Sequence, residues 1–362
     1  MTDSSKAGLF GIQHSNRDFS SEDSWGKNQF NSSFPIALGC YLYSKNLKAV
    51  YITLDNNLDI KHKQIGIDEL YGGNPIDGSL EYDFEMPFDS YRIYVSGAYE
   101  KDDVVIKKFD TKKQLKCVEI KLTALPDNST FSLSEDKYSC ELVVRQPTIM
   151  YLACGIINRF QTKKDKLKQL IGTKFDGIID WNNQVEIKKY LLTMKDTIYA
   201  MMKSNPDVEE PIIMEPIWKT KGKSQEMPLD CLDVFVWSNF ALIKLFSKDA
   251  TASGNVTRQE RSLVWLIKML LDYTKSGTFN YAQITDNITL GNLNDKAFAS
   301  NGKATYDFLK CAELTSPRIK SSEINNIILG NGVDLLSPER RFDAVIQFNA
   351  KLAKEKNKNE SN

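Results

Sequence analysis

The feature that most constrains the fold of this chain is a series of short β-type segments between Ala49 and Leu122. These runs are rich in Val, Ile and Tyr, and Asn, Asp, Gly and Pro separate them, as is typical of strands joined by turns. They are AVYITLD, QIGIDEL, LEYDFEM, YRIYVSG, VVIKKF and LKCVEIKL. The pattern predicts a mixed, mostly antiparallel sheet over roughly Ala49 to Leu122.

Helical patterns flank this sheet and dominate the rest of the chain. We expect one helix over residues 34–49 and another that begins near Pro147, because proline suits the first turn of a helix. Further helices are predicted at residues 163–171, 186–203, 231–248 and 257–275. Thr257 and Glu260 form a capping-box pattern before the last of them. Residues 279–303 are rich in Asn, Asp and Gly and are expected to form surface loops. The predicted fold class is α/β (α+β), a mixed sheet flanked by helices with a largely helical C-terminal half.

Composition excludes several kinds of chemistry. His14 and His62 are the only histidines in the 362 residues, so a His-rich metal site is excluded and a Ser-His-Asp triad has few ways to form. The six cysteines are scattered without a CxxC pair, which favours buried, reduced thiols. Any catalysis is therefore expected to use carboxylates and lysines.

Charge and hydropathy limit the location and the partners. No apolar run approaches the roughly 20 residues that span a bilayer, and the segment MTDSSKAGLF lacks the features of a secretory signal, so we expect a cytoplasmic protein. Lys and Arg together number 47, as do Asp and Glu. This balance gives no global basic field for nucleic acid, although a local basic cleft would be sufficient.

The last two β-type runs predict a hairpin with a charged face. In the second strand, Glu119 and Lys121 lie on one face, and Val118, Ile120 and Leu122 lie on the other. Positions 103 and 119 are symmetric about Thr111 in the turn, so Asp103 is expected beside Glu119. A register slip of one residue would bring Asp102 there instead. Asp103 is favoured if Val104 and Ile106 share the core face with Val118 and Ile120.

Such a face suits hydrolysis of phosphodiesters. Two carboxylates, Asp103 and Glu119, with the carbonyl of Ile120, would hold Mg²⁺, which prefers oxygen ligands. Lys121 would position a water molecule and offset charge on the phosphate oxygens. Alternating charges also decorate solvated strands in many proteins, so the spacing alone does not decide the matter. Glu81 or Glu85 could add a further acidic group, although a carboxylate at the edge of the sheet is the simpler interpretation.

Four longer segments bear a family resemblance. They are VEIKLTALPDNST, NRDFSSEDSWGKNQFNSSFP, GTKFDGIIDWNNQ and SPERRFD. Together they resemble the HindVP family of type II restriction endonucleases over nearly the whole chain, and Glu119 to Asp127 is the most specific part. The resemblance implies a PD-(D/E)xK nuclease fold, dependence on Mg²⁺ and cleavage of double-stranded DNA at a short palindrome of the GRCGYC type. Lys101-Asp102 stands where the family motif has a Pro before its first Asp, which makes Asp103 less secure than Glu119 and Lys121.

The domain and DNA-contact hypotheses follow from this interpretation. We expect residues 1–160 to form the catalytic core with a polar N-terminal arm, and residues 161–350 to form a helical region for DNA recognition or dimerisation. These two parts could be one continuous domain, and residues 351–362 are expected to form a flexible tail. Candidate DNA contacts have basic or amide side chains of the kind that read base edges or bind phosphates. They are Arg17, Lys27, Asn28, Asn31, Arg145 and Gln146. A surface loop, or a plain helix start for Arg145 and Gln146, is the alternative.

The expected partners are double-stranded DNA and a second copy of the chain, because a two-fold dimer matches a palindrome. A cognate DNA methyltransferase would share the site without needing to bind. Two other functions stay open. One is a structure-specific nuclease of repair or recombination, and the other is a non-catalytic DNA-binding protein in which Glu119 and Lys121 form a surface ion pair.

Overall fold

A computed structural model describes His14 and residues 27–121, 123–124, 142–218, 230–294, 296–300, 308–315 and 318–320 of the chain. The side chains of residues 27–34 are not described. The predicted flexible tail, 351–362, lies outside these ranges.

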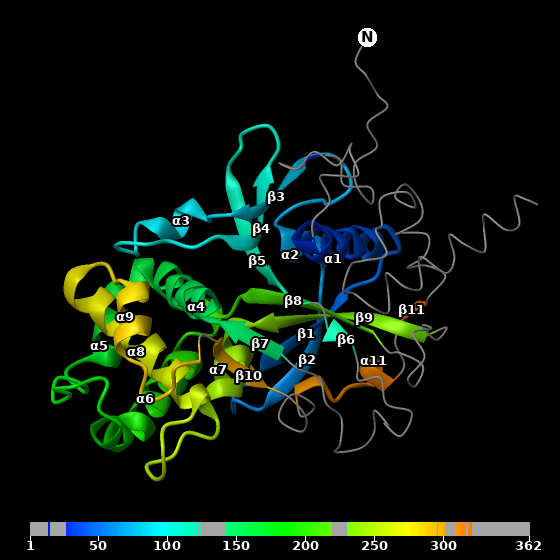
Figure 1. Cartoon of the computed structure of the whole chain (residues 1–362). Helices are drawn as coiled ribbons and strands as arrows, with labels where there is room; N and C mark the ends of the chain where they lie inside the picture. The colour runs from blue at the N-terminus through cyan, green and yellow to red at the C-terminus, as the bar shows by residue number, and fades with distance from the viewer. Residues whose placement is uncertain are drawn as a thin grey trace, which may run out of the picture.

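A mixed sheet forms the centre of the molecule (Figure 1). Its strands follow the order β2-β1-β9-β8-β5-β4-β3, with β6 beside β8 and β11 beside β9. The β1–β9 and β5–β8 pairs are parallel, and the other neighbours along the main path are antiparallel. The strand bounds are β1 Ala49–Leu54, β2 Ile60–Ile65, β3 Leu80–Met86, β4 Asp102–Lys108, β5 Gln114–Ile120, β6 Thr123–Ala124, β8 Pro211–Trp218, β9 Asp230–Ser238 and β11 Ile319–Lys320.

Helices cover both faces of this sheet, which is the arrangement that buries parallel strands. One face packs against α1 and α2, and the opposite face against the larger group formed by α4, α7 and α8 (Figure 1). The bounds are α1 Lys27–Ser44, α2 Ile67–Tyr71, α3 Asp89–Arg92, α4 Gln146–Arg159, α5 Lys164–Ile171, α6 Gln184–Ser204, α7 Asn239–Ser247, α8 Arg258–Ser276, α9 Tyr281–Asn287 and α11 Ala312–Thr315. The predicted α/β class, with a mixed sheet flanked by helices, is confirmed.

A second, two-stranded sheet leads into α4. It consists of β7, Leu142–Arg145, and β10, Lys296–Ser300, which run antiparallel. Because β10 lies within residues 279–303 and α9 precedes it, the expectation that this range forms only surface loops is wrong.

Several helices lie where the sequence predicts them. The Thr257–Glu260 capping box is present at the start of α8, and α5, α6 and α4 begin within two residues of the expected positions. The first helix, predicted at residues 34–49, instead spans Lys27–Ser44. It starts before residue 34, and it ends earlier than predicted because β1 already begins at Ala49. None of the described helices is both long and apolar enough to cross a bilayer.

Three segment predictions are wrong. QIGIDEL contains the end of β2 and then α2, which ends at Gly72 in the left-handed conformation. YRIYVSG contains the end of α3 and a turn, because Tyr91, Tyr94 and Val95 are buried at helical spacing. Residues 231–238 belong to β9 rather than to a helix. The run from Val234 to Trp237 is fully buried, and a continuous apolar run has no period that distinguishes a central strand from a buried helix.

The later strands also change the extent of the sheet. The sequence confines it to roughly Ala49 to Leu122, whereas β8 and β9 come from the second half of the chain and lie between β1 and β5. Two prolines, Pro211 and Pro216, hide β8 in the sequence because proline cannot donate a ladder hydrogen bond.

Candidate active site

The β4–β5 hairpin has the register that the sequence predicts. Val104 pairs with Val118, and Val105 pairs with Cys117, so the pairing is symmetric about residue 111. Val104, Ile106, Val118 and Ile120 all contribute to the core that α1 and α2 cover. The alternation of side chains therefore turns Asp103, Glu119 and Lys121 toward the opposite face.

Hydrogen bonds fix these residues at the end of β5. The backbone N–H of Ile120 donates to Oδ2 of Asp103 at 2.7 Å, which ties the start of β4 to the end of β5. On its other side, β5 runs parallel to β8, with Glu119 opposite Ile213, and the N–H of Lys121 donates to the carbonyl of Met214 at 3.0 Å. The Lys121 amine forms an ion pair with Glu119 Oε1. The structure thus brings Asp103, Glu119 and Lys121 together.

Burial and mutual repulsion perturb the acidic groups. Burial and the charge of Glu119 raise the pKa of Asp103 to about 7, against the opposing effects of Lys121 and the Ile120 N–H. Burial would lower the pKa of Lys121, but Glu119 and Asp103 raise it above its ordinary value, so the amine stays charged. Carboxylates that destabilise one another's charge in a desolvated place are a donor set that a divalent cation would stabilise.

Asp102 lies immediately beside this group. It is only 3% exposed, its Oδ1 accepts the N–H of Asp103 at 2.9 Å, and its carboxyl is hydrogen-bonded to the Cys117 thiol. Burial, with Glu119 and Asp103 nearby, raises the pKa of Asp102 well above its usual range. The preference for Asp103 over Asp102 as a ligand stays a prediction, although Asp103 is the one tied to β5 next to Glu119.

The two further acidic candidates of β3 differ in position. Phe84 pairs with Val104 and Met86 with Asp102, so Glu85 lies opposite Asp103, and its charge contributes to the raised pKa of Asp103. Glu85 also has a φ of 57°, unusual for a residue other than glycine. Glu81 instead lies at the turn end of the hairpin, with its Oε2 3.4 Å from Lys107 Nζ and 3.0 Å from Lys112 Nζ.

The donor set is small. Within the residues that the structure describes, no group of three or more His, Cys, Asp or Glu side chains is arranged to hold a metal ion. The predicted ligand set consists only of the carboxylates of Asp103 and Glu119 and the carbonyl of Ile120.

The histidines lie away from the candidate site: His14 stacks on Phe109, and the His62 Nε2 is 2.5 Å from the carbonyl of Phe308. Cys40, Cys117, Cys154 and Cys311 form no disulfide, as the sequence predicts for those four.

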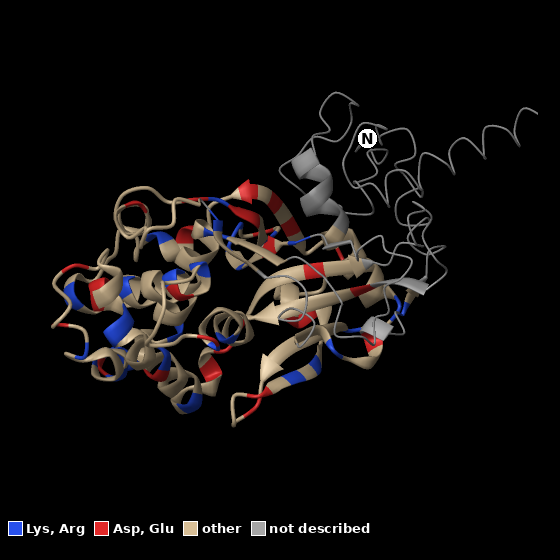
Figure 2. Cartoon of the chain, turned by 60° about the horizontal axis from the view of Figure 1, so that its bottom comes forward, with Lys and Arg blue, Asp and Glu red and all other residues tan. Residues whose placement is uncertain are grey.

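The candidate DNA contacts are only partly described. Arg145 is the exposed last residue of β7, opposite Lys296 of β10, and Gln146 begins α4, so both lie at the predicted helix start. Lys27, Asn28 and Asn31 belong to α1, but their side chains are not described, and Arg17 lies outside the described residues. Along the ribbon of the described residues, Lys and Arg are interspersed with Asp and Glu rather than gathered in one part (Figure 2).

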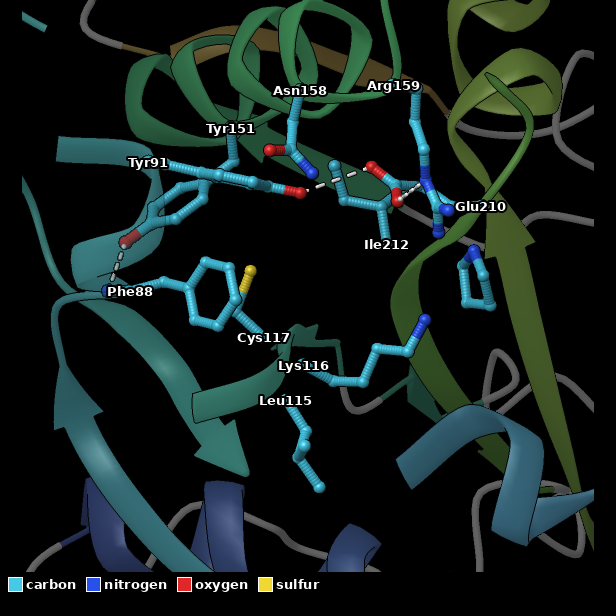
Figure 3. A pocket seen from close by; sticks show the side chains of 11 residues that line it. Phe88, Tyr91, Leu115, Lys116, Cys117, Tyr151, Asn158, Arg159, Glu210 and Ile212 are labelled. Atoms are coloured by element: carbon cyan, nitrogen blue, oxygen red, sulfur yellow. Dashed lines mark hydrogen bonds and ion pairs between the residues drawn. The ribbon is translucent and has the colours of Figure 1, made fainter. Parts of the chain in front are cut away.

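A cavity of about 250 Å³ adjoins the site along β5. It lies between β5, β8 and α4, and Figure 3 shows Cys117, Tyr91, Arg159 and Glu210 around it. The sequence analysis did not single out any of these four residues as a site. Cys117 lies two residues before Glu119 in β5, so both side chains point to the same face of the strand. This alternation was the one signal in the sequence that could have placed Cys117 on the face of the candidate site.

Comparisons with known proteins agree with this geometry. The sequence profile of the HindVP restriction endonuclease family matches residues 25–353. The chain belongs to this family. The predicted resemblance is therefore confirmed, and with it the enzyme class, a type II restriction endonuclease that hydrolyses DNA.

Two curated relatives of the HindVP family match over almost their whole length. The type II restriction enzyme HgiDI of Herpetosiphon aurantiacus is 41% identical over 342 residues, which cover 94% of this chain and 95% of the relative. The probable type II restriction enzyme HindVP of Haemophilus influenzae is 36% identical over 355 residues, covering 96% and 95%. No solved structure matches the chain.

Proposed function

We propose that this restriction endonuclease uses Mg²⁺ to cut both strands of DNA at a short palindromic site, with Asp103, Glu119 and Lys121 as its catalytic residues. The observation that supports the proposal is the convergence of two carboxylates and one amine at the end of β5. The carboxylates of Asp103 and Glu119 and the carbonyl of Ile120 would bind the ion. When bound, the ion polarises the phosphate and acidifies a water molecule.

The residues of the chain have separate tasks in this proposal. Lys121 keeps its positive charge beside Glu119, so it is suited to orient the attacking water and to stabilise negative charge on the phosphate oxygens. The water loses a proton to solvent as its oxygen forms a bond to phosphorus. The bond between phosphorus and the leaving sugar oxygen breaks, and that oxygen takes up a proton from solvent. The strand is then left with one phosphate end and one hydroxyl end. Neither a histidine nor a covalent enzyme intermediate is needed.

Asp103 is placed to respond to the ion. Without a cation its pKa of about 7 means that a large fraction of the carboxyl is protonated at neutral pH. A divalent ion beside it would favour the charged form, because opposite charges stabilise ionisation. We therefore expect metal binding to release protons.

Membership of the family supports a proposal for the substrate and the assembly. We propose a palindrome of the GRCGYC type, cut by a homodimer in which each subunit cleaves one strand, as part of a restriction-modification system with a methyltransferase for the same site. We also propose that residues 161–350 supply recognition and dimer contacts, and that Arg145 and Gln146 approach the phosphates near the site.

Digestion of a long DNA of known sequence tests the proposal. With Mg²⁺, we expect discrete fragments whose sequenced ends all carry the same palindrome, and no cutting with EDTA. A ladder of random sizes, or cutting confined to junctions and flaps, would instead indicate a nuclease without sequence specificity or a repair nuclease.

A further inference from the structure

The cavity beside β5 has a lining that matches one nucleotide. Its volume of about 250 Å³ is too small for a base pair, and Figure 3 shows aromatic side chains at one side and cationic side chains at the other. The walls come from the loop before α3, from β5, from α4 and from the start of β8. Asn158 and Arg159 of α4 are exposed at its mouth.

The charge of the lining is positive. Glu210 is already engaged, because Arg159 Nε donates to its Oε2 at 3.0 Å and the Tyr91 hydroxyl donates to its Oε1 at 3.3 Å. The side chain of Lys116 makes no ion pair or hydrogen bond within the described part of the chain, and its amine lies on the same side of the cavity as the Arg159 guanidinium (Figure 3). Two cations and one paired carboxylate therefore leave an excess positive charge that suits a phosphate.

The opposite side is lined by three largely buried aromatic side chains, Phe88, Tyr91 and Tyr151, whose exposed parts face the cavity. Phe88 and Tyr91 meet edge to face with their ring centres 4.8 Å apart, and Tyr151 lies 6.2 Å from Tyr91. Aromatic rings of this kind stack on nucleobases regardless of base identity. The amide nitrogen of Asn158 adds a donor to the rim for the edge of a base, because the amide oxygen already accepts from the Tyr94 hydroxyl at 2.9 Å.

We propose that this cavity binds a single nucleotide, with its phosphate at Lys116 and Arg159 and its base against Phe88 and Tyr91. The nucleotide has two sources with the same chemistry: a free nucleoside monophosphate, or a nucleotide of the DNA substrate turned out of the duplex. The second source rests on the proposed function. A nucleotide of the DNA substrate could reach the cavity because the cavity lies close to the candidate active site. Cys117 of its lining precedes Glu119 by two residues, about 7 Å along the strand.

Free ligands test the binding chemistry without any cleavage. Calorimetry with the full chain in EDTA would compare the four deoxynucleoside monophosphates with inorganic phosphate. We expect at least one nucleotide to bind about ten-fold tighter than phosphate, and Lys116→Met to weaken it about ten-fold, as for loss of a charged hydrogen bond. Lys113→Met, an exposed lysine of the same hairpin, is the matched control and should bind normally.

A duplex identifies the source. 2-Aminopurine would be placed at successive positions of the cleavage site and its fluorescence followed on binding in EDTA. If the fluorescence rises at one position, and the rise is lost in Lys116→Met but kept in Lys113→Met, the cavity binds a nucleotide of the DNA substrate. If nucleotides bind but the fluorescence does not rise at any position, the cavity binds a free nucleotide. Phosphate binding as tightly as the nucleotides, or neither nucleotide binding nor a rise, overturns the proposal. Both binding measurements are made in EDTA and do not depend on cleavage. A failure of the proposed nuclease function would therefore be seen in the digestion experiment and not in these measurements.

Discussion

Lys121 gives the most direct test at the scale of single residues. Replacing it by Met keeps the bulk of the side chain and removes the charge beside Glu119. We expect the single-turnover cleavage rate to fall by about 10²–10³, the usual cost of losing one group that stabilises transition-state charge. Circular dichroism and binding of the DNA site should be unchanged, and Lys113→Met should cut at the normal rate. Cutting retained in Lys121→Met would reject the proposed site.

Replacing Asp102 or Asp103 by Asn, which has nearly the same shape, tests which of the two carboxylates is the metal ligand. Burial, with Glu119 and Asp103 nearby, raises the pKa of the Asp102 carboxyl well above its usual range and so disfavours its charged form, and an amide can still accept the N–H of Asp103. We therefore expect Asp102→Asn to retain cutting within about ten-fold, whereas Asp103→Asn loses about 10² or more, as for an essential group. The cleavage rate at saturating Mg²⁺ measures both. The reverse ranking would make Asp102 the metal ligand.

The raised pKa of Asp103 also predicts how stability depends on pH. In the unfolded chain this carboxyl titrates near its ordinary value of 3.8, and in the folded, metal-free protein near 7. Between these values the folded state retains a proton that the unfolded state has lost, so stability falls as pH rises through this window. Asp103→Asn should therefore raise the melting temperature in EDTA by a few degrees at pH 8, and by much less at pH 4. An equal change at both pH values would contradict the titration.

At the scale of elements, the Lys188–Glu260 pair joins α6 to the start of α8. The amine lies 2.9 Å from both carboxylate oxygens, and both side chains are buried. Removing one partner of such a pair costs about 3–5 kcal/mol, because the other charge is left unpaired. We expect that loss in urea unfolding of Lys188→Met, partial recovery in Lys188→Met with Glu260→Gln, and a change below about 0.5 kcal/mol for the exposed Lys189→Met. A small effect of Lys188→Met would mean that the pair is solvated.

Which elements the sequence predicts depends on whether their pattern is local. The β4–β5 hairpin shows period-two alternation about a short turn, so the register and the convergence of Asp103 with Glu119 follow from the sequence. The α8 helix likewise has its cap and its apolar face in one segment. β9 is apolar on both faces, and its neighbours β1 and β8 are distant in the chain, so no local signal distinguishes it from a helix. The cavity at Cys117 and Glu210 was missed for the same reason, since its walls meet only through tertiary packing.

At the scale of the whole molecule, the even distribution of charge bears on how DNA is bound. Lys and Arg balance Asp and Glu, and Figure 2 shows both signs mixed along the ribbon of the described residues. Such a distribution of charge gives little long-range attraction to DNA, so affinity must come from local contacts. This arrangement favours an enzyme that encloses one short site and limits binding to the large excess of other sequences.

The proposed homodimer makes a prediction about mixed enzymes. If each subunit cuts one strand, a dimer of one wild-type and one Lys121→Met subunit binds the palindrome with a single working site. Subunits mixed by co-expression with two different affinity tags, and purified through both, should therefore convert supercoiled plasmid to nicked circles, with linear product formed far more slowly than by the wild type. Sedimentation velocity of the purified protein should give a mass near twice 41.2 kDa. Linear product at half the wild-type rate without a nicked intermediate, or a monomeric mass with DNA bound, would show that one subunit cuts both strands.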